Sequence, residues 1–383
     1  MYQIKTLNKI SPVGLAHLTE SYILTEKTED ADAILVRSQD MHEMEFSEKL
    51  EAIARAGAGV NNIPLDRCAA SGIVVFNTPG ANANAVKELV LCGMLLASRN
   101  IPSALTWAKG LTEDVSKTVE KGKSQFAGHE ILGKTLGIVG LGAIGRKVAD
   151  AAKALGMHIV GYDPYYVSGG DGITVYPDLA EMLPLCDIVT LHLPANDATK
   201  DMVNKEFLAS MKDGAILLNF SRDKLVNDVD LLIALESGRL AQYVTDFPND
   251  NLVGRDHIIL LPHLGASTEE AEDNCASMAV KELRDFLENG NIINSVNFPK
   301  VDMGPLGDCH RLAFFVKDME NPLEEMMTML SAAEIKVSKI QAGRRAADGI
   351  AYVLAEVANT DAHKLLFGGE TGAKIIRHRE ILK

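Results

Sequence analysis

Positive charge is scarce in this chain of 383 residues. Lysine and arginine together number 38, against 52 aspartates and glutamates, which gives a formal net charge of −14. Nucleic acids and anionic membranes are recognised by clustered positive charge, so we expect neither as a partner. An anionic small molecule would have to be held by local cations against the field of the whole protein.

Cysteines are also few, with five spread over the whole chain at positions 68, 92, 186, 275 and 309. Their number is odd and no spacing suits a metal site or a redox pair, so we expect no metal. No apolar run reaches the length needed to cross a bilayer. The first nine residues lack the apolar core of a signal peptide. These absences favour a cytoplasmic protein, in which the cysteines are small apolar or surface residues.

The chain does contain a glycine pattern in a specific context. An apolar run ends in Gly140-Leu141-Gly142-Ala143-Ile144-Gly145 and passes directly into a helical pattern. Asp163 closes the next apolar run, eighteen positions after Gly145. Strand, glycine turn, helix start, second strand and acid together are typical of dinucleotide binding. Asp163 would accept hydrogen bonds from the ribose hydroxyls and repel a 2′-phosphate, which favours NAD over NADP.

Each glycine of this pattern has a separate expected role. Gly140 permits the turn, Gly142 lets the backbone approach the pyrophosphate, and Gly145 lets helix and strand pack closely. The free N–H groups of the new helix, beginning with Ala143 and Ile144, would hold the phosphates.

The length of the chain predicts two or three domains. Short strands alternate with helices over residues 1–100, and the βα alternation of residues 136–261 predicts a parallel, doubly wound sheet. After a linker, the remainder reads βαββαβ, the ferredoxin-like pattern. The predicted class is α/β, with a doubly wound NAD-binding domain at 101–269 inserted in a flavodoxin-like substrate-binding domain. That second domain comprises 1–100 and 270–298, and a third domain spans 305–383.

Residues that follow the predicted strands are candidates for chemistry, because ligands of an open parallel sheet bind beyond the carboxyl ends of its strands. An arginine there can pair with a carboxylate at two points. A histidine can exchange the proton of an alcohol, while a nicotinamide carries the hydride. The set therefore suits hydride transfer to a 2-oxo acid. It comprises His192-Leu193-Pro194, Ser221-Arg222, Asp246 to Asp250 and His263.

Each of these residues also has an ordinary structural interpretation. His263 fits a loop histidine, Arg222 fits a surface ion pair at a strand end, and Asp250 fits a turn. His192 fits a core or cofactor-lining histidine better than an acid. Their joint occurrence, in this order, favours the catalytic interpretation.

Several segments resemble the D-isomer-specific 2-hydroxyacid dehydrogenase family, over nearly all of residues 33–298. They are residues 54–62 (ARAGAGVNN), 77–82 (NTPGAN), 133–142 (GKTLGIVGLG), 219–222 (NFSR) and the highly specific 261–268 (LPHLGAST). The resemblance implies that Arg222 holds the substrate carboxylate and that His263 is the acid/base. It also implies that the backbone at Gly59 and Val60 faces the carboxylate. The implied cofactor site comprises Gly140, Gly142, Ala143, Ile144, Gly145, Asp163, His192, Leu193, Pro194, Thr199, Phe220, Ser221, Arg222, Asp246, His263 and Gly265.

The third catalytic residue of the family is a glutamate that follows an Asp-Val-Phe type of turn. The corresponding segment here, residues 246–250 (DFPND), is one residue shorter and ends in aspartate. We take Asp250 as the carboxylate that pairs with His263, with Asn249 and Asp246 as alternatives. A shorter carboxylate still reaches the imidazole if the loop lies closer to it.

Within the family, the chain resembles the branch that oxidises D-3-phosphoglycerate to 3-phosphohydroxypyruvate with NAD, the first step of the phosphorylated route to serine. Arg37 and Ser38 match the place where that branch holds the substrate phosphate, and Asn82 matches a substrate-side asparagine. The tail resembles an ACT-type regulatory domain. Residues 318–322 (DMENP) depart from the His-x-Asn motif of serine-inhibited relatives, so an assembly role for the tail is an alternative to serine feedback.

Two other functions remain open. The substrate could be another 2-hydroxy acid, such as that of a hydroxypyruvate or glyoxylate reductase or an erythronate-4-phosphate dehydrogenase. The chain could also be a non-catalytic NAD-sensing scaffold, although Arg222 and His263 argue against this. The expected partners are a small anionic phosphorylated 2-hydroxy acid and further copies of the chain, as a homodimer through the cofactor domain or a homotetramer.

Overall fold

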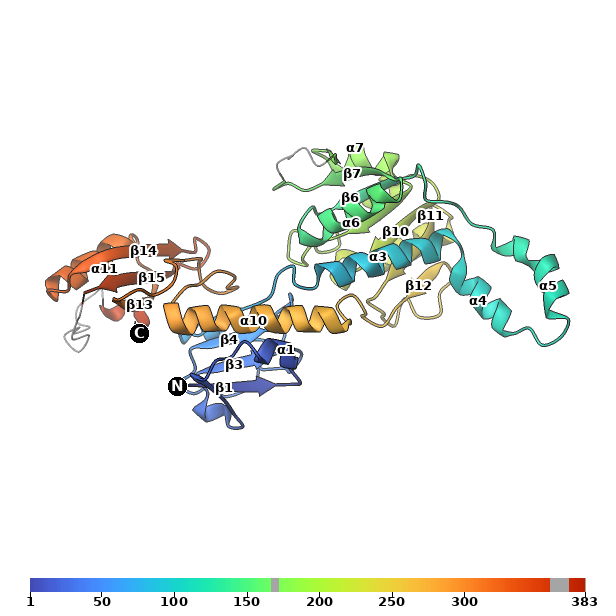
Figure 1. The fold of residues 1–383 in the computed structure, drawn as a ribbon. Coiled ribbons are helices and arrows are strands. Elements are labelled where there is room, and N and C mark those ends of the chain that lie inside the picture. Colours follow the sequence, from blue (N-terminus) through green and yellow to red (C-terminus); the bar gives the residue numbers. More distant parts are fainter. Residues whose placement is uncertain (167–171, 359–371, 383) are drawn as a thin grey trace. The chain divides into compact units, whose positions relative to one another are not determined.

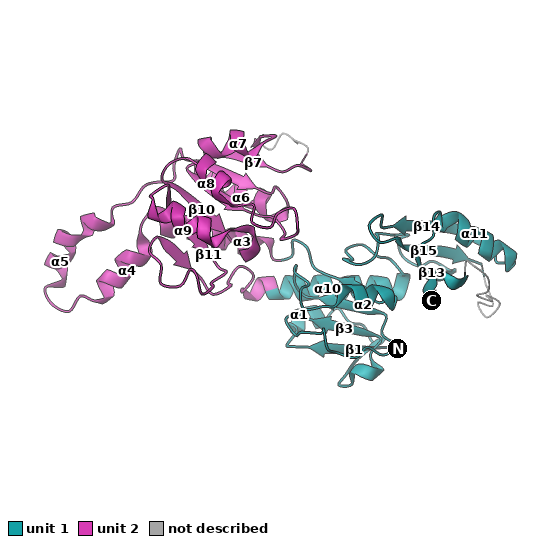
Figure 2. Cartoon of the chain, turned by 180° about the vertical axis from the view of Figure 1, so that it is seen from behind, with its two compact units in different colours: residues 1–81, 272–383 teal, residues 82–271 magenta. Residues whose placement is uncertain are grey.

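The described chain divides into two compact units (Figure 1; Figure 2). A computed structural model describes residues 1–166, 172–358 and 372–382. The first unit comprises Met1–Ala81 and Glu272–Lys383, and the second comprises Asn82–Ala271. Among these described residues, no single helix has the length and apolarity to cross a bilayer, although the bent pair α3 (Ala83–Ser98) and α4 (Ile101–Lys109) meets that test jointly.

The second unit is built on a seven-stranded parallel sheet with the order β12-β11-β10-β9-β6-β7-β8. The direction of winding reverses between β6 and β9, as in doubly wound dinucleotide-binding folds. The expected fold of this domain is therefore confirmed. The strands are β6 (Thr135–Val139), β7 (His158–Tyr162), β8 (Thr174–Val175), β9 (Ile188–Leu191), β10 (Ala215–Asn219), β11 (Leu240–Thr245) and β12 (Ile258–Leu260).

Helix α3 packs inside this unit, against α6 (Ala143–Ala154), although the sequence analysis assigned it to the substrate-binding domain. Helix α3 also packs closely on the sheet side, where Gly93 has no side chain: a Cβ there would lie 2.7 Å from the Phe220 ring. Asn100, at φ +52°, separates α3 from α4. The remaining helices are α5 (Val115–Gly122), η2 (Lys123–Phe126), α7 (Leu179–Met182), η3 (Leu183–Leu185), α8 (Lys205–Ser210), η4 (Asp223–Leu225) and α9 (Asp228–Glu236).

The first unit contains a five-stranded parallel sheet with the order β2-β1-β3-β4-β5, which is the flavodoxin-like order and confirms that expectation. β3 is an unbroken buried apolar run, as expected for a parallel strand covered on both faces. The strands are β1 (Tyr2–Leu7), β2 (Tyr22–Thr25), β3 (Ala33–Val36), β4 (Ala52–Arg55) and β5 (Val74–Phe76). The helices are α1 (Pro12–Leu15), η1 (Thr28–Asp30), α2 (Leu65–Ala70) and α10 (Glu269–Asn289).

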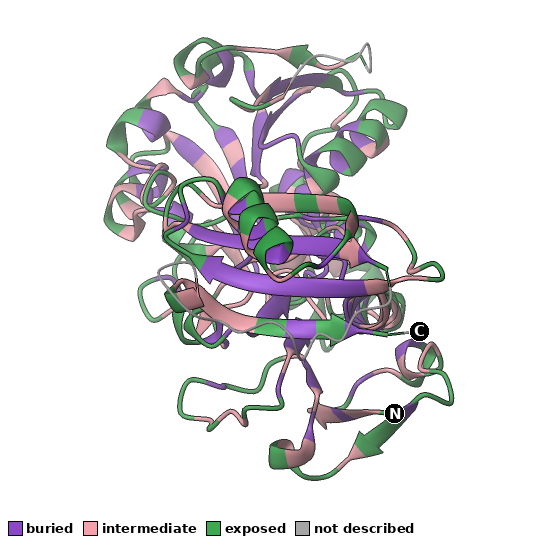
Figure 3. Ribbon diagram, turned by 90° about the vertical axis from the view of Figure 1, so that its left-hand side faces the viewer, coloured by how far each residue is buried: buried purple, intermediate pink, exposed green. Residues whose placement is uncertain are grey.

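The C-terminal part of the same unit is a four-stranded antiparallel sheet with the order β14-β15-β13-β16. This is the ferredoxin-like order, and in Figure 3 its middle strands are buried along most of their length. The short helix expected before the last strand lies largely outside the described residues. The elements are β13 (His310–Lys317), α11 (Pro322–Ala332), β14 (Val337–Arg344), β15 (Ile350–Val357) and β16 (Ile375–Ile381).

This C-terminal sheet shares one hydrophobic core with the parallel sheet of the first unit. The Phe286 ring of α10 lies between those of Phe76 and Phe315, at centroid distances of 5.7 and 6.4 Å. Phe315 in turn contacts Tyr352 at 4.9 Å. Helix α10 is therefore packed against both sheets.

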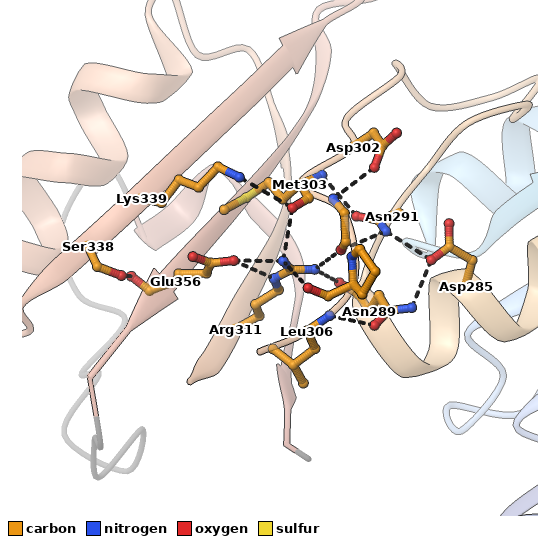
Figure 4. Close-up of polar contacts among 12 residues, drawn as sticks. Asp285, Asn289, Asn291, Asp302, Met303, Leu306, Arg311, Ser338, Lys339 and Glu356 are labelled. Carbon is orange, nitrogen blue, oxygen red and sulfur yellow. Dashed lines mark hydrogen bonds and ion pairs between the residues drawn. The ribbon is translucent and has the colours of Figure 1, made fainter. Parts of the chain in front are cut away.

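The buried Arg311 joins the C-terminal sheet to α10 and to the linker between them (Figure 4). The side chain of Arg311 is fully buried, and its guanidinium lies 2.6 Å from the carboxylate of Glu356. It also donates to four backbone carbonyls at the end of α10 and in the linker. They belong to Asn289 (2.7 Å), Met303 (3.2 Å), Gly304 (2.7 Å) and Pro305 (3.3 Å).

Replacing Arg311 with leucine should cost about 3–5 kcal/mol of stability, because it leaves the partly buried Glu356 without its counter-ion and removes a donor from four backbone carbonyls. Urea denaturation of the full chain, with limited proteolysis across residues 299–306, measures this. Lys317→Leu is the matched control, since Lys317 is exposed on the same strand. A loss below about 1 kcal/mol for Arg311→Leu would contradict the role of this ion pair.

Candidate active site

In the second unit, the predicted site residues follow six strands that run in the same direction. The carboxyl ends of parallel strands share one edge of the sheet, so these residues lie along that edge. They are Gly140 after β6, Asp163 after β7, His192 after β9, Ser221 and Arg222 after β10, Asp246 after β11 and His263 after β12.

The three glycines of the turn have different surroundings. Gly140 has a φ of +98°, and a Cβ there would lie 2.4 Å from the carbonyl oxygen of His192. A Cβ on Gly145 would lie 2.1 Å from the carbonyl oxygen of Gly140. A Cβ on Gly142 would meet no atom within 4 Å. Packing therefore requires glycine at 140 and 145, whereas Gly142 opens onto free space at the start of α6, where phosphate would approach.

Asp163 is tied to the glycine turn. One carboxylate oxygen accepts the backbone N–H of Leu141, and the other accepts that of Tyr165, both at 2.9 Å. Each carboxylate oxygen has a second lone pair, so both oxygens keep the capacity to accept from ribose hydroxyls. The two hydrogen bonds thus fix the carboxylate of Asp163 relative to the glycine turn. The turn and this acid together fit NAD.

His192 cannot serve as the proton donor at neutral pH. Its Nε2 lies 3.1 Å from the hydroxyl of Thr190, and its Nδ1 is buried with no partner in the part of the chain that the structure describes. Burial lowers the pKa of His192 to about 3, which keeps the imidazole neutral. This agrees with the interpretation of His192 as a core or cofactor-lining residue.

The remaining members of the predicted cofactor site have structural partners. The Thr199 hydroxyl donates to the carbonyl of Pro194 at 2.6 Å and closes the loop after β9. Leu193 lies against the turn, 2.9 Å from the position of a Cβ on Gly140. The Phe220 side chain is 4% exposed and belongs to the hydrophobic core, so it packs against α3 and does not line an open site.

Asn219, which the sequence analysis did not select, holds the loop that carries Arg222. Its side-chain oxygen Oδ1 accepts the N–H of Ser221 at 3.1 Å, and its side-chain Nδ2 donates to the backbone carbonyl of Arg222 at 2.8 Å. The Ser221 hydroxyl donates to the carbonyl of Leu191 at 2.6 Å, which ties the loop to β9. The signals in the sequence were a polar residue ending an otherwise apolar strand and its place in the segment 219–222.

His263 lies on a strained turn. Its φ is +50°, a left-handed conformation that non-glycine residues rarely adopt outside sites that need it. Its N–H donates to the carbonyl of Asp246 at 2.9 Å. The side chain is exposed, and its ring packs against Phe247 at a centroid distance of 4.8 Å. The turn therefore presents the imidazole away from the core.

Asp246 is the carboxylate that the structure brings to this turn. It is 1% exposed; one oxygen accepts the N–H of Gly265 at 2.7 Å, and the other has no partner among the described residues. Burial raises the pKa of Asp246, and the Gly265 N–H and the charges of His263 and Arg222 oppose that rise. Asp246 thus acts electrostatically on both proposed catalytic side chains.

The expected pairing of Asp250 with His263 is not formed. Asp250 is exposed, and over the described residues no hydrogen bond or ion pair joins it to His263. Asn249, the other alternative, caps its own turn by accepting the N–H groups of Asn251 and Leu252. Asp250 is exposed, whereas Asp246 is buried and bonded to Gly265 in the turn that carries His263.

The predicted phosphate-binding loop lies in the first unit, directly after β3. Asn8, at φ +72°, accepts the N–H groups of Arg37 (3.3 Å), Ser38 (3.0 Å) and Gln39 (2.9 Å) through one carbonyl oxygen. Asn8 was not selected from the sequence, because it acts across 29 positions. It fixes the backbone from which the Arg37 side chain projects.

Two further charged residues surround Arg37. Arg55, at the end of β4, donates from Nε to the carbonyl of Arg37 at 3.0 Å. Glu272 of α10 lies 2.7 Å from the guanidinium of Arg37. Gly59 and Val60 follow Arg55 in the loop after β4, whereas Asn82 belongs to the second unit, at the start of α3. Among residues 1–166, 172–358 and 372–382, no three His, Cys, Asp or Glu side chains are grouped as metal ligands.

Comparison with known proteins agrees with this geometry. Residues 91–265 match the NAD-binding domain of the D-isomer specific 2-hydroxyacid dehydrogenases. A D-3-phosphoglycerate dehydrogenase of Haemophilus influenzae is 33% identical over 360 residues, covering 90% of this chain and 85% of that relative. One of Methanocaldococcus jannaschii is 37% identical over 318 residues, covering 79% and 59%. The NAD+-bound 3-phosphoglycerate dehydrogenase of Entamoeba histolytica superposes with a TM-score of 0.63 at 28% identity, covering 77% of this chain and 98% of that one.

The chain therefore belongs to the D-isomer-specific 2-hydroxyacid dehydrogenase family, as the sequence motifs indicated. Its doubly wound domain is the NAD-binding domain of such an enzyme. The chain spans 52 to 63% of the length of several matching relatives, those of Methanocaldococcus jannaschii, rat and Bacillus subtilis among them.

The glycine turn yields a test that separates binding from folding. Gly142→Ala should leave the melting temperature within about 2 °C, because its Cβ has free space, yet weaken NADH binding about tenfold or more. Gly145→Ala should lower the melting temperature by more than about 4 °C, because its Cβ meets backbone. Thermal unfolding and NADH fluorescence titration measure both. Unchanged NADH affinity in Gly142→Ala would place the pyrophosphate elsewhere.

The two candidate carboxylates are distinguished by the kinetics of 2-oxo acid reduction. Asp246→Asn removes the buried charge beside the turn that bears His263, so kcat should fall about tenfold or more. Asp250→Asn, at an exposed position, should leave kcat and KM unchanged. The opposite pattern, a loss of kcat for Asp250→Asn alone, would restore the assignment made from the sequence.

Proposed function

We propose that the protein oxidises D-3-phosphoglycerate to 3-phosphohydroxypyruvate with NAD, the first step of the phosphorylated route to serine. The observation that carries this proposal is the pair of arginines on the first unit. Arg37 and Arg55 come from the ends of neighbouring parallel strands, and the main chain of Arg37 accepts a hydrogen bond from Arg55. Such guanidinium groups suit a phosphate. Relatives that bear the name D-3-phosphoglycerate dehydrogenase support the same substrate.

In the proposed mechanism, Arg222 binds the substrate carboxylate and polarises the oxygen on C2. His263 takes the proton of the C2 hydroxyl as the C–O bond gains double-bond character. The hydride that leaves C2 is accepted by NAD when it is bound. In reverse, the imidazolium of His263 returns the proton to the oxygen of the 2-oxo acid.

Asp246 acts through His263 and through the turn that bears it. Its buried carboxylate lies beside the turn of His263, and its bond to Gly265 N–H holds the left-handed turn. Arg37 and Ser38 are proposed to bind the phosphate, with Gly59, Val60 and Asn82 on the substrate side. The cofactor residues keep the roles expected for them, except that the Phe220 side chain supports α3.

We also propose that the chain forms a homodimer through its cofactor unit, or a homotetramer if the tails also pair. Helices α4 and α5 bury no residue, and Leu105 and Val115 are 53% and 48% exposed, a pattern that suits a covering partner. Sedimentation equilibrium of the full chain tests this, and a monomer would contradict it. All five cysteines are free thiols, which suits the reducing cytoplasm proposed as its location.

The substrate is tested by NADH oxidation with 3-phosphohydroxypyruvate, hydroxypyruvate and glyoxylate side by side. We expect kcat/KM to favour the phosphorylated acid by about a hundredfold, or roughly 2.7 kcal/mol. Arg37→Ala should remove most of that preference by raising KM, with a smaller effect on kcat. Equal rates on all three acids would support a general 2-oxo acid reductase, and no turnover of any would support the NAD-sensing scaffold.

A further inference from the structure

The guanidinium of Arg37 already has an anionic partner in the absence of substrate. Nη1 lies 2.7 Å from a carboxylate oxygen of Glu272, and the two side chains are 38% and 44% exposed. Both residues lie in the first unit, Arg37 after β3 and Glu272 in the first turn of α10. The Glu272 carboxylate therefore pairs with the same Arg37 guanidinium that the proposed function assigns to the substrate phosphate.

The surrounding charges make this a compact cluster. Cys275, one turn further along α10, is 4% exposed, and its thiol lies within electrostatic reach of Arg37, Arg55 and Glu272. Glu272 thus offsets part of the charge of Arg37, so an incoming phosphate meets less positive charge than the Arg37 guanidinium alone would supply.

We propose that Glu272 is an internal counter-ion for Arg37 that the substrate phosphate must displace, so that Glu272 sets the affinity for phosphorylated substrates. This inference rests on the proposed function. An ion pair at this exposure is weak and opens readily. A phosphate carries more charge than a carboxylate and forms two-point bonds with a guanidinium, so it replaces Glu272. Breaking the pair between Arg37 and Glu272 takes up part of the binding free energy of the phosphate, which raises KM.

This arrangement acts selectively. Hydroxypyruvate has no phosphate to place at Arg37, so it neither displaces Glu272 nor is repelled by it at that point. Removing the charge of Glu272 should therefore help phosphorylated substrates alone. The effect should also shrink as ionic strength rises, because the pair is exposed to solvent.

The experiment compares Glu272→Gln with Glu270→Gln, an exposed glutamate of the same helix. Glu272→Gln should lower KM for 3-phosphohydroxypyruvate about two- to fivefold, with kcat unchanged and KM for hydroxypyruvate unchanged. Glu270→Gln should leave all three constants unchanged. In an Arg37→Ala background, Glu272→Gln should have no effect on KM, because the guanidinium that it competes for is gone.

The outcomes separate this inference from the proposed function. An effect of Arg37→Ala without any effect of Glu272→Gln leaves the phosphate site in place and overturns the counter-ion role. Glu272→Gln could lower KM for 3-phosphohydroxypyruvate equally with and without Arg37, or Glu270→Gln could lower it by the same factor. Either result assigns the effect to the general charge of the protein and also overturns the counter-ion role. If Arg37→Ala leaves the preference for phosphate intact, the phosphate site itself fails, and the counter-ion with it.

Discussion

The burial of Arg311 is the constraint on which the first unit depends. A charge with no exposure to water is tolerable only because Glu356 and four carbonyls surround it. Those carbonyls belong to the end of α10 and to the linker, so the same side chain joins the helix, the linker and the C-terminal sheet. Helix α10 is about 30 Å long, and its other end carries Glu272 beside Arg37. The packing of the tail and the geometry of the proposed phosphate site thus share one rigid element.

In the second unit, environment assigns different roles to similar side chains. His192 and His263 both follow parallel strands, yet burial keeps the first neutral while a left-handed turn exposes the second. Asp163 and Asp246 are both strand-end acids, but one is bonded to the glycine turn and the other to the turn that carries His263. Residue type alone does not distinguish the members of each pair. Burial and backbone partners do, which is the usual way that a site sets its acid and base.

Features that depend on local order were predictable from the sequence. The glycine turn, the acid after β7 and the strand-end positions of Arg222 and His263 follow from motifs and from the rule that parallel strands share an edge. Contacts between distant segments were not predictable. Asn8 holds a loop 29 to 31 positions away, and Asp246 holds Gly265 across 19. Spacing within residues 246–250 could not tell which carboxylate is buried, so Asp246 was only an alternative to Asp250 in the expectation from the sequence.

A counter-ion at Arg37 is consistent with efficient catalysis, because the phosphate is remote from the carbon that loses hydride. Binding it equally in ground state and transition state lowers KM without raising kcat. Arg222 and His263 instead act on the oxygen and proton whose charges change during the reaction. In this chain of net charge −14, Glu272 offsets the charge of Arg37, which lowers the ground-state affinity for the phosphate. Stabilisation of the transition state then depends on Arg222 and His263, at the carboxyl edge of the cofactor sheet.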